Sequence, residues 1–192
     1  RIFRFLGVVL RKFFIDQFIY RAQLAAGSEK APPLKNVEHE LDRLIPVRYD
    51  TAALYLSFIM MWISALGYFR KAIGRDFNPD VLSFLDGLER CYVDAAQVYA
   101  HCVSTTRRPD RAPSLRLAFV YAVDPHLFCV PSLHVMVVGY TWKKLADLLE
   151  ARGLADRFQV ELAALHDRAV RITESILYVR QHSVNCIPAG RS

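Results

Sequence analysis

Long apolar or amphipathic segments dominate the chain, and none alternates apolar and polar residues with the period of two that a half-buried strand requires. The segments that predict helices are residues 1–26, 51–69, 80–104, 131–150 and 155–175. A further helix is expected to begin near His182. This pattern predicts an all-α fold, a helical bundle forming a single domain over residues 1–192.

The segment 51–69 contains no charged residue. A helix of this length rises about 28 Å, close to the hydrocarbon thickness of a bilayer. Three basic residues, Arg70, Lys71 and Arg75, follow the segment, and such a flank is typical of the cytoplasmic end of a span. We therefore expect a transmembrane helix here. The alternative is a central buried helix of a soluble bundle.

The first 26 residues combine aromatic and apolar side chains with basic ones. The basic residues are Arg1, Arg4, Arg11, Lys12 and Arg21. They interrupt the segment too often for a membrane span, so we expect a basic amphipathic helix in the headgroup region of a membrane. An ordinary surface helix is the alternative. Because the chain begins with Arg1 rather than Met, we expect a fragment or a shortened reading frame.

The formal net charge of +6 suits an anionic partner, namely nucleic acid, a phospholipid surface or a phosphorylated substrate. The basic residues are dispersed and the aromatic ones fall in apolar runs, so we expect no nucleic-acid binding. No CxxC pair is present, which disfavours a zinc ribbon. We expect buried free thiols at the four cysteines, Cys91, Cys102, Cys129 and Cys186.

Three short stretches carry residues suited to chemistry. The first is "RRP" at residues 107–109, and the third is "SILYVRQH", which leads to His182. Between them, "CVPSLHVMVV" places Ser132 and His134 inside the run 125–142, which has no acid, lysine or arginine. Taken singly, each histidine is better explained as a satisfied core residue, so the hypothesis depends on the ordered set.

In this order the stretches resemble the type 2 phosphatidic-acid phosphatase superfamily, which includes lipid phosphatases, vanadium haloperoxidases and lipid phosphotransferases. The family's motifs end in Arg-Pro, read Pro-Ser-Gly-His, and read Ser-Arg-x5-His-x3-Asp. Arg108-Pro109, the "PSLH" of residues 131–134, and Ser175 with His182 match them in order. The leucine of "PSLH" is similar to the inositol phosphorylceramide synthase branch, and the resemblance covers residues 40–190.

The resemblance implies a membrane-embedded bundle of the phosphatase and haloperoxidase type. Its expected function is a membrane lipid-phosphate phosphatase or phosphotransferase, with no cofactor and no metal, acting on a phospholipid or prenyl phosphate. His182 would attack phosphorus to form a phosphohistidine, and His134 would protonate the leaving oxygen. The expected phosphate-binding residues are Arg108, Ser132, Ser175 and Arg180. The expected location is the bacterial inner membrane or a eukaryotic endomembrane.

The chain departs from the family pattern at three positions. His101 stands where the first motif has lysine, and Ile176 replaces the arginine of the third motif. Cys186 replaces the aspartate that would hold the nucleophilic imidazole, a group whose neutralisation costs about 10⁴ in turnover in serine proteases. Unless Glu174 or Asp124 substitutes, the alternative is a catalytically impaired family member that serves as a membrane or lipid-binding protein.

A metal site offers a different interpretation of the same histidines. Cys129 and His134 form a C-x4-H pair, and His182 and Cys186 form an H-x3-C pair. Histidine and cysteine at this spacing can share a metal, so the four residues could form a structural zinc site between two segments. The phosphatase pattern explains more residues and is the favoured interpretation.

Overall fold

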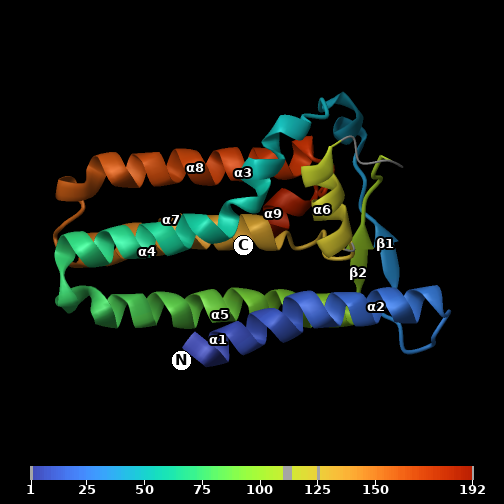
Figure 1. The fold of residues 1–192 in the computed structure, drawn as a ribbon, viewed down its shortest axis with the longest axis horizontal. Coiled ribbons are helices and arrows are strands. Elements are labelled where there is room, and N and C mark those ends of the chain that lie inside the picture. Colours follow the sequence, from blue (N-terminus) through green and yellow to red (C-terminus); the bar gives the residue numbers. More distant parts are fainter. Residues whose placement is uncertain (1, 110–113, 125, 192) are drawn as a thin grey trace.

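The computed structural model describes residues 2–109, 114–124 and 126–191 of the chain. Residues 1, 110–113, 125 and 192 lie outside the described residues, including the start of the predicted run 125–142. The long helices of the bundle are α4 (Phe58–Ile73), α5 (Asn78–His101), α7 (Leu133–Ala151) and α8 (Gln159–Tyr178). Helix α7 lies in the centre and contacts the other three (Figure 1). The predicted helical architecture is confirmed at this level.

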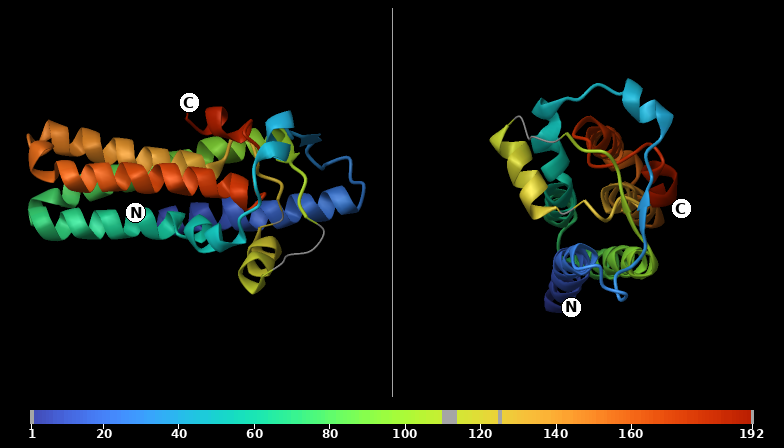
Figure 2. Two further views of the ribbon diagram at one scale, coloured as in Figure 1. Left: turned by 90° about the horizontal axis from the view of Figure 1, so that it is seen from above. Right: turned by 90° about the vertical axis from the view of Figure 1, so that its right-hand side faces the viewer.

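The N-terminal segment forms a continuous rod along one side of the bundle. It consists of α1 (Ile2–Val9), the π-helix η1 (Leu10–Ile15) and α2 (Asp16–Ala25), and we call residues 2–25 the N-terminal rod. The rod lies against α5, as Figures 1 and 2 show. The ring of Phe5 packs edge-on against Trp62 and Tyr92, with centroids 5.8 and 5.9 Å away. The predicted helix is confirmed, and its inner face belongs to the core.

Short elements gather at one end of the bundle (Figure 2). They are β1 (Leu34–Asn36), η2 (Glu40–Leu44), η3 (Tyr49–Thr51), α3 (Ala52–Leu56), β2 (Val103–Thr105), α6 (Leu115–Val123) and α9 (Cys186–Arg191). Strands β1 and β2 pair in parallel, with Leu34 opposite Val103. The predicted helix over residues 80–104 is therefore too long, because its last residues belong to β2.

The predicted helix over residues 51–69 is broken at Ser57. There α3 and α4 meet at an angle of 44°, and the Ser57 hydroxyl donates a hydrogen bond to the carbonyl oxygen of Leu54 at 2.7 Å. Within the described parts of the chain, no single helix combines the length and the apolar composition needed to cross a bilayer. Among the described helices, the bent pair Tyr49–Leu56 and Phe58–Ile73 meets both criteria when its two parts are taken together.

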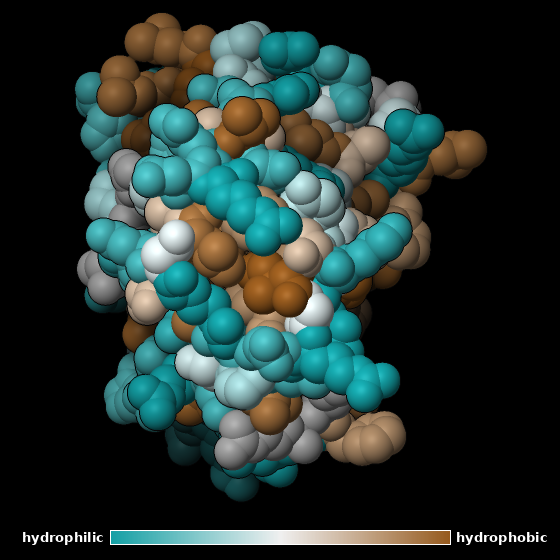
Figure 3. Space-filling model, turned by 90° about the vertical axis from the view of Figure 1, so that its left-hand side faces the viewer, coloured by the Kyte–Doolittle hydropathy of each residue, from teal (hydrophilic) through white to brown (hydrophobic). Residues whose placement is uncertain are grey.

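The predicted helix over residues 131–150 agrees with α7 within two residues at each end, whereas α8 and α9 begin four residues later than predicted and α6 was not predicted. Helix α7 ends at Ala151, and Gly153 follows with φ of 65°, a left-handed conformation that glycine adopts without strain. Two short 3₁₀ turns, η4 (Arg75–Phe77) and η5 (Asp156–Phe158), join the long helices at the far end of the bundle. Figure 3 looks onto this end, where hydrophilic side chains surround a small apolar group.

Helix α9 approaches the first turn of α7 so closely that only glycine fits at position 190. A Cβ atom there would lie 2.8 Å from the Cβ of Val135 and 3.0 Å from the carbonyl oxygen of Ser132. We expect Gly190→Ala to lower the free energy of unfolding by about 1–3 kcal/mol, because α9 must move away from α7. Urea unfolding measures the change. Gly139→Ala is the matched control, since nothing lies within 4 Å of its Cβ position and helix propensity improves.

Candidate active site

The site is built on the loop that leads into α7. Ser104 of β2 holds this loop, because its hydroxyl accepts a hydrogen bond from the backbone N–H of Val130 at 2.7 Å. Its own backbone N–H donates to the carbonyl oxygen of Leu127 at 2.9 Å, and its carbonyl accepts from Cys129 at 3.3 Å. Ser132 then caps α7, with its hydroxyl accepting from the N–H of Val135 at 3.5 Å.

His182 faces this cap from the segment after α8. Its Nδ1 lies 3.1 Å from the carbonyl oxygen of Cys129, and its Nε2 lies 3.4 Å from the hydroxyl oxygen of Ser132. A carbonyl oxygen can only accept, so Nδ1 carries the hydrogen of the neutral ring. Nε2 therefore keeps its lone pair, as a nucleophilic nitrogen must. The Cys129 carbonyl thus fixes the tautomer of His182, a role that the aspartate of the third motif has in the phosphatase superfamily.

His134 lies next to His182, with ring centroids 5.7 Å apart. Its ring is packed between Tyr55 and Phe58, at centroid distances of 4.2 and 4.1 Å, and only 3% of its surface is exposed. Burial, and then the charge of His182, hold the pKa of His134 well below its usual 6.5. In this environment His134 is neutral, and its Nε2 has no hydrogen-bond partner among the described residues.

Arg108 reaches the same place from the loop after β2. Its guanidinium donates to the carbonyl oxygen of Asp124 at 2.9 Å and to the side-chain oxygen of Gln181, and it lies over the ring of Tyr121 at 4.5 Å. Burial lowers the pKa of Arg108, and the nearby Asp124 opposes this shift. The Nε of Arg108 is buried and has no partner in the described part of the molecule.

Two of the predicted phosphate-binding residues are engaged elsewhere. The guanidinium of Arg180 donates to the backbone carbonyls of Asp42 and Ile45, the latter at 2.8 Å, so it holds the η2 turn in place. Ser175 is fully buried within α8, and its hydroxyl donates to the carbonyl of Ile172 at 2.7 Å. The structure thus brings Arg108, Ser132, His134 and His182 together and leaves Ser175 apart from them.

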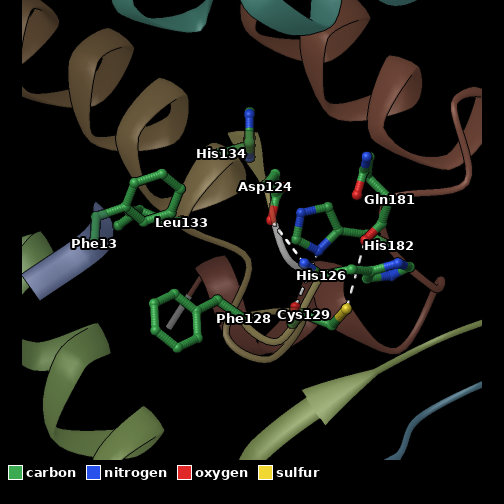
Figure 4. A pocket seen from close by; sticks show the side chains of 9 residues that line it. All are labelled: Phe13, Asp124, His126, Phe128, Cys129, Leu133, His134, Gln181 and His182. Carbon is green, nitrogen blue, oxygen red and sulfur yellow. Dashed lines mark hydrogen bonds between the residues drawn. The ribbon is translucent and has the colours of Figure 1, made fainter. Parts of the chain in front are cut away.

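A cleft of about 470 Å³ opens above His182, between the η2 turn and the loop after β2. Four arginines and two acidic residues line it, so the lining is basic overall. They are Arg43, Arg107, Arg108 and Arg180, with Glu38 and Asp42. On its other side, His182 borders a small cavity of about 10 Å³ that Asp124, His126, His134 and Gln181 also line (Figure 4). The imidazole therefore stands between a basic cleft and a small cavity with room for about one water molecule.

Gln181 and His126 were not predicted as site residues. His126 lies outside the three stretches, and Gln181 lies within the third, at a position to which the family motif assigns no role. Gln181 accepts from Arg108, which leaves the buried Nε2 of its own amide without a partner among the described residues. His126 adopts a positive φ of 62°, and its Nε2 lies 2.8 Å from the Thr106 hydroxyl. Burial, followed by the charges of Arg108 and His182, lowers the pKa of His126 to about 2.

The depressed pKa of His126 makes the stability of the protein sensitive to acid. Its folded pKa of about 2 lies below the unfolded value near 6.5, so the unfolded state binds the proton first. Stability is fully present above pH 6.5 and falls as the pH drops toward 2, by up to about 1.4 kcal/mol per pH unit. We expect His126→Asn, which tolerates positive φ, to flatten this slope in urea unfolding between pH 7 and pH 4.5. Equal slopes for the two proteins would contradict the assignment.

Cys186 lies beside His182 in the position of the family's aspartate. Its Sγ accepts from the backbone N–H of Ser183 at 3.3 Å, and the thiol of Cys129 lies against it. The hydrogen bond from the Cys129 thiol lowers the pKa of Cys186, and burial opposes this shift. Burial raises the pKa of Cys129. Cys186 is therefore the more acidic thiol of the pair, and its sulfur occupies the place of the carboxylate.

The two carboxylates considered as substitutes do not reach His182. Asp124 accepts from the hydroxyl of Tyr55 at 3.0 Å and from the N–H of His126 at 3.0 Å, and Glu174 is exposed on α8. The zinc interpretation is not supported either. Among the described residues, no group of three or more histidine, cysteine or acidic side chains is arranged to hold a metal ion.

The chain was compared with protein-family models, with curated proteins and with solved structures. No family model matches it, and neither does any curated protein or solved structure.

Proposed function

We propose that the protein is a lipid-phosphate phosphatase or phosphotransferase that works through a phosphohistidine at His182. The observation that carries the proposal is a set of buried polar atoms without partners around this histidine. They are the Nε of Arg108, the Nε2 of Gln181 and the Nε2 of His134. A buried polar atom without a partner costs about 1–3 kcal/mol, so a ligand rich in oxygen atoms would be stabilised here.

A phosphate group suits this cleft because phosphoryl transfer depends on neutralising the charge of the transferred group. Arg108 is half-buried in the cleft, where its charge is screened less than that of the exposed Arg43 and Arg107. Arg43 and Arg107 line the outer part and would attract an anionic headgroup. The Ser132 hydroxyl, 3.4 Å from Nε2 of His182, adds a hydrogen-bond donor close to the nucleophile.

The proposed reaction has two steps. The lone pair on Nε2 of His182 forms a bond to phosphorus, the bond from phosphorus to the leaving oxygen breaks, and His134 gives that oxygen a proton. Water or an alcohol then attacks phosphorus and returns a proton to His134, and the bond to His182 breaks. His134 is neutral in the free protein, so it must gain its proton when the phosphate dianion binds, because a nearby anion raises the pKa of an imidazole.

A lipid substrate is supported by the apolar residues at the edge of the cleft. Leu41 and Leu44 are exposed on η2, with Leu44 at 79%, and they flank the cleft residues Asp42 and Arg43. An acyl or prenyl chain that leaves the cleft would contact them, so a phospholipid or prenyl phosphate is the proposed substrate. The proposed location is the membrane that holds such a substrate, either a bacterial inner membrane or a eukaryotic endomembrane.

Trapping the intermediate tests the proposal directly. Purified protein in detergent is mixed with phosphatidic acid labelled in the phosphate, and the reaction is quenched with alkali, in which phosphohistidine survives. We expect label on the peptide that contains His182 and none on the His182→Ala variant. A protein that binds the lipid yet never becomes labelled would instead be the catalytically impaired lipid-binding alternative. That alternative is favoured by the lack of a carboxylate in contact with His182 among the described residues.

Substituting Cys186 tests how the charge of the nucleophile is balanced. We expect Cys186→Asp to raise turnover about tenfold, because a carboxylate stabilises an imidazolium better than a cysteine sulfur does. Cys186→Ala removes the sulfur and should lower turnover by a similar factor. Steady-state rates on phosphatidic acid at pH 7 measure both effects, and equal rates for the two variants would show that an acceptor at position 186 has no part in turnover.

A further inference from the structure

The outer face of the N-terminal rod is apolar, although the inner face already fixes the rod to the bundle. Inside, Phe5 packs on Trp62, and Phe13 packs on Phe128 with centroids 6.1 Å apart. Gln17 is fully buried, and its side-chain oxygen accepts from the N–H of Leu127 at 3.4 Å. The outer side chains are therefore not needed to hold the rod in place.

Large apolar side chains nevertheless point away from the bundle over the whole rod. The exposed ones are Phe3, Leu6, Leu10, Ile15, Phe18 and Ile19. Phe3 is the most open of these, at 89% exposed. Phe3, Leu6 and Leu10 recur at intervals of three and four residues, so they share one face of the helix. Such a run of exposed apolar residues marks an interaction surface.

The charges on the rod indicate which partner covers this surface. Asp16 is the only acidic residue of the rod, and Lys12 lies 3.7 Å from it. Arg4 pairs with Glu89 of α5, at 3.0 Å. Arg11 and Arg21 are exposed and form no ion pair with any residue in the described ranges. Apolar residues flanked by free cations suit the headgroup region of an anionic bilayer.

We propose that the outer face of the N-terminal rod lies in the interface of an anionic lipid bilayer, parallel to its surface. A second copy of the chain fits this face less well, because a symmetric contact would bring Arg11 and Arg21 of one copy near those of the other. The inner face of the same rod reaches the candidate site, since Phe13 lines the small cavity beside His182. Docking therefore places the bilayer one helix away from the nucleophile.

Co-sedimentation with vesicles tests the proposal in the absence of substrate, so its failure would leave the catalytic proposal untouched. The full chain is mixed with vesicles of phosphatidylcholine alone or with phosphatidylglycerol added. We expect binding to the anionic vesicles that weakens as salt rises, because salt screens the contribution of Arg11 and Arg21. No binding of the wild-type chain to the anionic vesicles would overturn the proposal.

Two sets of variants locate the surface. The triple variant Leu6→Ser, Leu10→Ser and Phe18→Ser should bind at least about tenfold more weakly. Its control, Val160→Ser with Val170→Ser, removes exposed apolar residues from α8, with Val160 at 78% exposed, and should bind like the wild type. Circular dichroism checks that the variants are folded. Equal binding by the triple variant, or a dimer in sedimentation velocity that the triple variant disrupts, would assign the face to another role.

Discussion

Replacing His182 with alanine should reduce the turnover of phosphatidic acid in detergent by at least about 10³-fold, because it removes the nucleophile and leaves only the basic cleft. The geometry of the ring supports this size of effect. A carbonyl oxygen fixes Nδ1 and the Ser132 hydroxyl lies at Nε2, so no other described side chain at the site presents a nitrogen lone pair in the same position. Steady-state turnover at pH 7 measures the loss.

The matched control for this variant is His166→Ala. His166 is exposed on α8, where its ring packs on Trp142 at 4.5 Å, and its removal should leave turnover unchanged. Since His182 is buried, circular dichroism must show that the His182→Ala protein keeps its helical content. A folded His182→Ala protein with wild-type turnover would exclude the phosphohistidine mechanism.

Replacing Arg108 with lysine should lower kcat/KM by about 10²–10³-fold, although the formal charge is kept. The guanidinium holds the Asp124 carbonyl and the Gln181 side chain together while its Nε stays free for a ligand. An ammonium group is a point charge, and it cannot make these directed contacts at the same time. The loss should therefore appear in kcat as well as in KM.

Arg43→Lys is the control for this prediction, because Arg43 lines the same cleft but is exposed at its edge. An exposed cation contributes mainly to attraction over a distance, so its replacement by another cation should leave kcat/KM within about threefold. If the two lysine variants behave alike, the cleft recognises charge alone and Arg108 has no special position in it.

The long helices could be predicted because their apolar residues recur at helical spacing along the sequence. Helix α7 begins and ends within two residues of the prediction, and Pro79 and Gly153 mark the start of α5 and the end of α7. The break at Ser57 could not be predicted, because an apolar segment has no polar face whose rotation would reveal a bend. Strands β1 and β2 are three residues long, too short to display a period of two.

The order of the motifs predicted the centre of the site, where Arg108, Ser132 and His182 meet. It did not indicate that Arg180, which lines the cleft, also donates to two backbone carbonyls, because a sequence does not tell whether a guanidinium faces a ligand or a backbone carbonyl. It also missed Gln181, whose role depends on the contact with Arg108 across the fold. Such contacts depend on tertiary geometry, which spacing along the chain does not record.

Ser104 fixes how many residues can separate the loop before α7 from Arg108. Ser104 holds the loop before α7 through three hydrogen bonds. Arg108 follows a few residues later, in the loop after β2. One residue of extended chain spans up to about 3.5 Å, more than the 2.9 Å bond between Arg108 and the Asp124 carbonyl can stretch. A residue inserted or removed between Ser104 and Arg108 would therefore pull the guanidinium out of the site, whereas loops elsewhere can change in length without moving it.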